Sequence, residues 1–161
     1  MFIHKRFTVL IFLLVSSLPA YAEWTYKERI DDFTDEDRST IAPDSSDYEQ
    51  DDLLMLVVSC QSDGLNVLLS HSYMGGDSDD QIRVTMRVDK NEALGPIYFD
   101  LQGNEASWMP TRHVKNIVQQ MINGESLVFR ATDPLDNESL RQKVSLEGFS
   151  SEVRKLSCLN L

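Results

Sequence analysis

Residues 53–60 have the sequence LLMLVVSC, an almost unbroken apolar run that is typical of a strand buried on both faces or at a sandwich core. The turn residues QSDG follow at 61–64, and residues 65–73 then alternate apolar and polar side chains, which predicts a hairpin. In residues 81–89, Ile, Val, Met and Val alternate with Arg, Thr, Arg and Asp. This alternation predicts a half-buried strand of an antiparallel sheet.

Shorter segments continue the same pattern towards the C-terminus. Further strands are predicted at residues 97–101, 106–109, 127–132 and 142–146. Apolar residues at helical spacing predict one helix from an N-cap at Thr111 to a stop at Gly124, and a final short helix that delivers Cys158. We therefore expect a mainly β fold, an antiparallel β-sandwich-like architecture with two short helices.

The first 22 residues have the composition of an export signal. Lys5 and Arg6 precede an apolar run at residues 7–15, and Ala20-Tyr21-Ala22 forms a small-x-small cleavage site. The run is much shorter than the ~20 residues of a membrane span, so cleavage is favoured over an uncleaved anchor. We expect residues 1–22 to be a cleaved signal peptide and the mature protein to be periplasmic, without stable membrane insertion.

Charge divides the remaining chain into two parts. Loss of Lys5 and Arg6 takes the formal net charge from -11 to -13, a balance that disfavours nucleic acid as a partner. Most of this negative charge belongs to an acidic N-terminal arm at residues 23–52, in which residues 39–52 lack periodicity and are expected to form a partly disordered loop. The segment before this loop is expected to dock on the domain through the apolar side chains of Trp24, Tyr26, Ile30 and Phe33. Residues 53–161 are expected to form one β-rich domain, and the protein to be a monomer.

Cysteine usage predicts one covalent cross-link. Cys60 and Cys158 are the only cysteines, and an even pair in an oxidising compartment is most simply a disulfide. A metal centre is not expected, because His71 and His113 lie at no short ligand spacing from either cysteine. The acidic loop at residues 77–80 lacks the closing carboxylate of a calcium loop.

No catalytic constellation stands out in the sequence, so no enzyme activity and no cofactor are expected. His113 is interpreted as a helix-surface residue and His71 as a solvated residue at a strand end, because neither has an evident nucleophile or carboxylate partner. The aromatic residues Trp24, Tyr26, Tyr98 and Trp108 suit either a sugar-stacking surface or the core and edges of the sheet.

Binding to a partner is the predicted activity. Arg83 and Arg87, joined by Lys90, lie on the outer face of the most regular strand, either as a solvated face or as receptors for carboxylates such as those of a peptidoglycan stem. If the N-terminal arm captures a partner, deletion of residues 40–50 is expected to weaken that binding and to flatten its salt dependence. The candidate partner-binding residues are Asp44, Asp47, Glu49, Asp51, Asp52, Arg83 and Arg87.

Several segments together resemble the type VI secretion-associated VasI family, also called TagO, and related exported proteins. They are Trp24, Asp31-Asp32-Phe33-Thr34-Asp35, Leu56-Val57-Val58-Ser59-Cys60, Gly64-Leu65-Asn66-Val67, Val84-Thr85-Met86-Arg87-Val88-Asp89, Leu127-Val128-Phe129-Arg130, Val144-Ser145-Leu146-Glu147-Gly148-Phe149 and Cys158. The resemblance implies a periplasmic accessory or binding domain of the cell envelope, and no catalytic residue transfers. The alternative is an acidic inhibitor or immunity protein directed against a basic, envelope-targeting enzyme.

Overall fold

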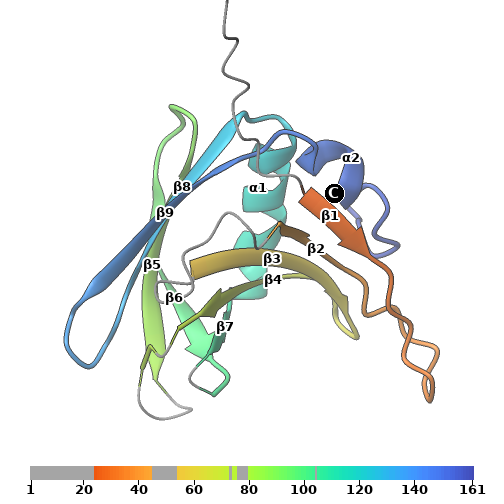
Figure 1. Cartoon of the computed structure of the whole chain (residues 1–161), viewed down its shortest axis with the longest axis horizontal. Coiled ribbons are helices and arrows are strands. Elements are labelled where there is room, and N and C mark those ends of the chain that lie inside the picture. The colour runs from red at the N-terminus through yellow and green to blue at the C-terminus, as the bar shows by residue number, and fades with distance from the viewer. Residues whose placement is uncertain (1–23, 45–53, 73, 76–79, 104) are drawn as a thin grey trace, which may run out of the picture.

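The computed structural model describes residues 24–44, 54–72, 74–75, 80–103 and 105–161. Nine strands in these ranges form one antiparallel sheet in the order β1-β2-β3-β4-β7-β6-β5-β8-β9, as Figure 1 shows. The strands are β1 (Trp24–Lys27), β2 (Thr40–Pro43), β3 (Leu54–Gln61), β4 (Gly64–His71), β5 (Gln81–Val88), β6 (Leu94–Leu101), β7 (Ala106–Trp108), β8 (Ser126–Thr132) and β9 (Ser139–Ser145). The mainly antiparallel β fold predicted from the sequence is confirmed.

The sheet is bent around its short middle strand. β7 has three residues, and within the described part of the sheet it alone pairs with both β4 on one side and β6 on the other. In Figure 1 the sheet curves around the helix α1 (Thr111–Ile122), and β3 comes close to β9. This bend produces the sandwich-like shape from a single sheet, with one concave face and one outer face.

Alternation along the strands fills the concave face with apolar side chains. In β5 the four residues Ile82, Val84, Met86 and Val88 are buried, whereas Arg83 and Arg87 are exposed, as the sequence predicts. From the other side α1 adds Val114, Ile117, Val118 and Met121, the stripe that its apolar period indicates. The resulting core is continuous across both halves of the sheet.

Both helices differ in detail from the prediction. Thr111 is the first residue of α1 and not its N-cap; Pro110 occupies that position, and no side chain caps the helix. The helix α2 spans only Phe149–Val153, and successive turns carry the chain from there to Cys158. No helix in the part of the chain that the structure describes is long and apolar enough to cross a membrane.

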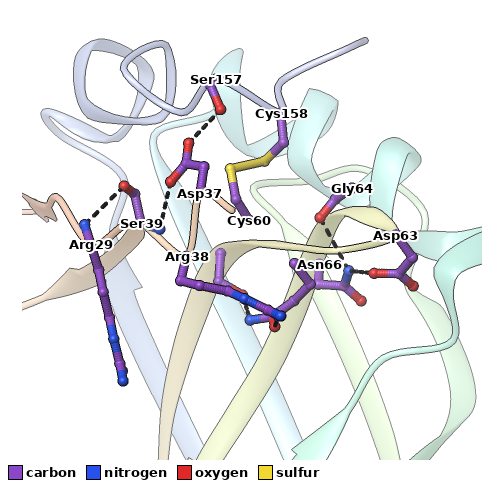
Figure 2. Close-up of a disulfide and its surroundings, with 12 residues drawn as sticks. Arg29, Asp37, Arg38, Ser39, Cys60, Asp63, Gly64, Asn66, Ser157 and Cys158 are labelled. Atoms are coloured by element: carbon purple, nitrogen blue, oxygen red, sulfur yellow. Dashed lines mark hydrogen bonds between the residues drawn. A yellow bond between two sulfur atoms is a disulfide. The ribbon is translucent and has the colours of Figure 1, made fainter. Parts of the chain in front are cut away.

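A disulfide joins Cys60 at the end of β3 to Cys158 near the C-terminus, across 98 residues of sequence (Figure 2). On the chain-entropy model, closure of a loop of this length stabilises the fold by roughly 4 to 5 kcal/mol. Next to it, Ser157 donates a hydrogen bond to Asp37, and the same carboxylate accepts from the Ser39 amide at 2.7 Å. The C-terminal segment is therefore fixed to both β3 and the chain that leads into β2.

The prediction of a loop over residues 39–52 is wrong for its first residues, which form a strand. Thr40–Pro43 form β2, which lies between β1 and β3 and buries Ile41 completely. A four-residue strand is too short to show a period in sequence, and its pairing partners are distant segments. Residues 45–53 lie outside the described residues, as does the predicted signal peptide.

Trp24 joins the two ends of the bent sheet. Its ring is 2% exposed and packs edge-on against Phe149 with 4.8 Å between centroids. Its indole Nε1 donates to the Ser145 carbonyl at 2.8 Å, so β1 is connected to the last residue of β9. Docking of the arm through Trp24 and the partly buried Tyr26 is confirmed.

The other two expected docking residues do not pack. Ile30 is 47% exposed and Phe33 is 97% exposed, because both lie in the turn between β1 and β2, beyond the reach of the core. Both side chains are apolar, but they lie at the tip of the hairpin formed by β1 and β2, which points away from the domain.

His71 is also placed differently from the prediction. It is 2% exposed rather than solvated, because it continues the inward-facing set of β4 that includes Val67 and Leu69. Among the described residues neither ring nitrogen has a hydrogen-bond partner, and the same holds for the buried hydroxyl of Ser107. Burial lowers the pKa of His71, although the carboxylate of Asp133, the backbone of Ala106 and the carboxylate of Glu105 act to raise it.

We predict that Trp24→Ala lowers the free energy of unfolding by about 3 to 5 kcal/mol, because it removes a buried ring and its hydrogen bond. The matched control is Phe33→Ala, which removes an aromatic ring only nine positions away in sequence. That change should stay within about 0.5 kcal/mol, since the ring is exposed. Urea unfolding curves of both variants measure the difference, and equal losses would show that Trp24 does not close the sheet.

We also predict that acid weakens the fold through His71. The unfolded chain binds a proton below the ordinary histidine pKa of about 6.5, whereas the folded protein, with its lowered pKa, stays neutral. Stability should therefore fall as the pH decreases from 6.5 towards the folded pKa. His71→Leu should flatten the pH dependence of the urea midpoint between about pH 7.5 and 5.5. Val67→Ala, a change at a buried residue of β4 that does not titrate, should leave the slope in place. An unchanged slope in His71→Leu would contradict the assignment.

Candidate functional site

The outer face of β5, β8 and β9 carries a concentrated positive charge. Thr85 lies opposite Arg130, Arg130 lies opposite Arg141, and Val128 lies between Arg87 and Lys143. Residues directly opposite one another in a sheet point to the same face. We define the basic face as the exposed side chains of Arg83, Arg87, Arg130, Arg141 and Lys143.

No carboxylate offsets these charges on the same strands. The sequences of β5, β8 and β9 contain no Asp or Glu. Acidic residues stand directly beyond the strand ends, at Asp80, Asp89, Glu125, Asp133 and Glu138. Within the described ranges the ion pairs are Arg38 with Glu36 and Lys155 with Glu152, both on other parts of the protein. A chain of strongly negative net charge thus presents a positive surface.

Arg130 and Arg141 are like charges in directly opposite positions on neighbouring strands. Such a pair destabilises a sheet, and an acidic residue at either position would remove the repulsion. A shallow groove of about 210 Å³ runs beside the pair and is lined by Arg87, Ala93 and Val128 as well as by the two arginines. Guanidinium groups around such a groove suit a planar carboxylate, which they bind through paired hydrogen bonds.

The structure brings Arg83 and Arg87 together with three residues that the sequence analysis missed. Arg87 Nε donates to the Asn91 carbonyl at 2.9 Å, which fixes its stem along the sheet. Arg130, Arg141 and Lys143 sit at alternate positions of their strands, so their outward direction is readable from sequence. Their position beside β5 is not, because it depends on the register of the sheet.

Of the five acidic residues predicted to bind a partner, only Asp44 lies within the described residues. Asp44 is exposed directly after β2 and lies apart in sequence from the basic face. Asp47, Glu49, Asp51 and Asp52 lie outside the described residues, so their role in partner capture stays a prediction.

Other titratable groups serve the fold. The backbone amides of Glu125 and Ser126 donate to the Asp89 carboxylate and lower its pKa, which connects the end of β5 to the start of β8. His113 is half-buried on α1. Among the residues that the structure describes, no three His, Cys, Asp or Glu side chains gather as a metal site requires. Asp77 and Asp79, from the loop at residues 77–80 that was considered for calcium, lie outside the described residues.

Comparison with known proteins supports the fold. The crystal structure of invasion associated protein B from Bartonella henselae is similar, with a TM-score of 0.53 and 15% sequence identity. The match covers 84% of this chain and 90% of that protein. No family model and no curated protein matches the chain, so the resemblance to the VasI family stays a prediction.

We predict that Arg130→Glu stabilises the protein by about 0.2 to 1 kcal/mol at low salt, because a repulsive cross-strand pair becomes attractive. The double variant Arg130→Glu/Arg141→Glu should lose this gain, since it restores repulsion. Thermal unfolding at low and high salt measures both effects, and salt should shrink the differences. A gain that persists in the double variant would show that the two side chains do not interact.

Proposed function

We propose that this chain is an exported binding protein of the bacterial cell envelope that holds the carboxylate-bearing stem peptides of peptidoglycan on its basic face. The observation that carries the proposal is the set of five exposed cations on three neighbouring strands that contain no acid. A solvated face of no function would be expected to interleave charges of both signs, as cross-strand pairing favours.

Two features of the chain support an oxidising compartment outside the cytoplasm. The disulfide between Cys60 and Cys158 is a bond that persists in oxidising compartments such as the periplasm. The signal predicted at residues 1–22 would deliver the chain there. Peptidoglycan supplies that compartment with a polymer that repeats carboxylates at short intervals.

The chemistry favours a multivalent and salt-sensitive contact. A single exposed cation contributes little, because water and salt screen it. Several cations that meet several carboxylates of one polymer add their weak contributions through effective concentration. Guanidinium and ammonium groups are hydrogen-bond donors without an acceptor, which suits them to hold carboxylates, so binding is the activity proposed.

Two finer roles from the sequence remain proposals. A secretion accessory would use the same face to hold an apparatus at the cell wall. An inhibitor or immunity protein would need an acidic surface, and the turn between β1 and β2 carries Asp31, Asp32, Asp35 and Glu36 beside the exposed Phe33. A basic, envelope-targeting enzyme is the partner that this second role would require.

The test is cosedimentation of the disulfide-bonded protein with purified peptidoglycan sacculi. The double variant Arg130→Ser/Arg141→Ser should bind at least about tenfold more weakly, and wild-type binding should fall with added salt. The matched control Lys27→Ser/Arg154→Ser removes two exposed cations elsewhere and should bind as the wild type does.

A second arm uses glycan strands from which an amidase has removed the stem peptides. Each cut leaves one carboxylate on the sugar, so loss of the salt-sensitive binding on these strands would support the stem peptides, and not the glycan, as the ligand. Absence of binding to intact sacculi, or an equal loss in the control variant, would contradict the proposal.

A further inference from the structure

A second surface with different chemistry lies beyond the basic face. It is a groove of about 710 Å³, where the turn between β3 and β4, the ends of β6 and β7, and the start of α1 meet. This volume lies within the ~300 to 1,000 Å³ typical of small-molecule sites. The lining of the groove includes Asp63, Asn66, Asp100, Gln102, Trp108 and Pro110.

Trp108 gives the groove an aromatic wall. It is the last residue of β7, lies opposite Asp100 of β6 and Leu68 of β4, and is only half-buried. Its indole Nε1 donates to Gln102 Oε1 at 2.5 Å, which holds the ring in one orientation. A large aromatic ring that is held in place beside a groove is preorganised to bind a ligand face.

Short polar side chains stand around this ring. Asn66 is 6% exposed, and its Nδ2 donates to Asp63 Oδ1 at 2.7 Å and to the Gly64 carbonyl at 3.2 Å, as Figure 2 shows. On the opposite side Asp100 accepts from Gln81 Nε2 at 2.7 Å. Carboxylate and amide groups are therefore fixed on both sides of Trp108.

These groups select a class of ligand by charge and by shape. Asp63 and Asp100 outweigh the one cation of the lining, Arg112, so phosphate and other anions are disfavoured. A pyranose ring has an apolar C–H face that stacks on an aromatic ring, and hydroxyls around its rim that pair with carboxylates and amides. The groove thus has the two chemical features that a neutral sugar requires.

An N-acetyl group fits the remaining part of the lining. Its amide can exchange hydrogen bonds with side-chain amides such as that of Gln102, and its methyl group can contact the apolar ring of Pro110. We propose that this groove binds a short, neutral chain of N-acetylated amino sugars, with one ring stacked on Trp108. The inference rests on the proposed function only in that such sugars form the backbone of peptidoglycan.

Fluorescence titration with the soluble trimer of N-acetylglucosamine tests this proposal. The chain has two tryptophans, and Trp24 is buried, so a ligand in the groove should change the emission of Trp108 alone. We expect a saturable change with a Kd on the order of 1 mM or tighter. Trp108→Ala should weaken binding at least about tenfold by calorimetry, while Trp108→Phe should keep part of it because a stacking ring remains.

Two further variants make the outcomes distinct. Asp100→Ala should weaken binding without removing the ring, and Arg130→Ser/Arg141→Ser should bind the trimer as the wild type does. No saturable signal with the wild type, or unchanged affinity in Trp108→Ala, would overturn this inference. The proposed function would then stand if salt-sensitive binding to sacculi persisted, and it would fail separately if sacculi were not bound.

Discussion

The bond between Cys60 and Cys158 ties the C-terminal segment to the third strand of the sheet, and the other features of the molecule depend on that closure. A single antiparallel sheet with a three-residue strand at its middle has little to keep it bent. The disulfide and the contact of Trp24 with Phe149 and Ser145 hold the two ends near one another. The bend in turn provides the concave side on which α1 and the apolar core assemble.

Closure of the concave side leaves the outer side free for binding. Because strand residues alternate, each inward apolar residue of β5, β8 and β9 places an outward neighbour on the opposite face. On this outward side the chain carries cations and no acids over three strands, and it tolerates the opposed Arg130 and Arg141. We propose that an anionic partner accounts for this positive surface on a chain of negative net charge. At the other half of the sheet, Trp108 and its polar neighbours offer a site of different chemistry.

Patterns within one segment were predictable from sequence, and pairings between segments were not. The alternation in residues 81–89 gave β5 and its outward arginines, and the lone cysteine pair gave the disulfide. β2 was not predicted because its four residues form a strand through pairing with β1 and β3, which the local sequence does not show. Arg130 and Arg141 were missed because their position beside Arg87 depends on the register of the sheet. His71 was predicted to be solvated because serines flank it, but alternation along β4 places its side chain on the buried face with Val67 and Leu69. Phe33 shows the converse, an apolar residue that the hairpin carries away from the core.

The central claim is that β5, β8 and β9 present the binding surface. Amide hydrogen exchange of the disulfide-bonded protein, with and without soluble disaccharide-peptide fragments of peptidoglycan, tests it most directly. Among the described strands β9 pairs with β8 alone, so its outer edge has exchangeable amides that report on a ligand at this side of the sheet. The account predicts slower exchange in β8 and β9 when the fragments are present. Unchanged exchange in these strands, or protection confined to the acidic turn at residues 28–38, would contradict it.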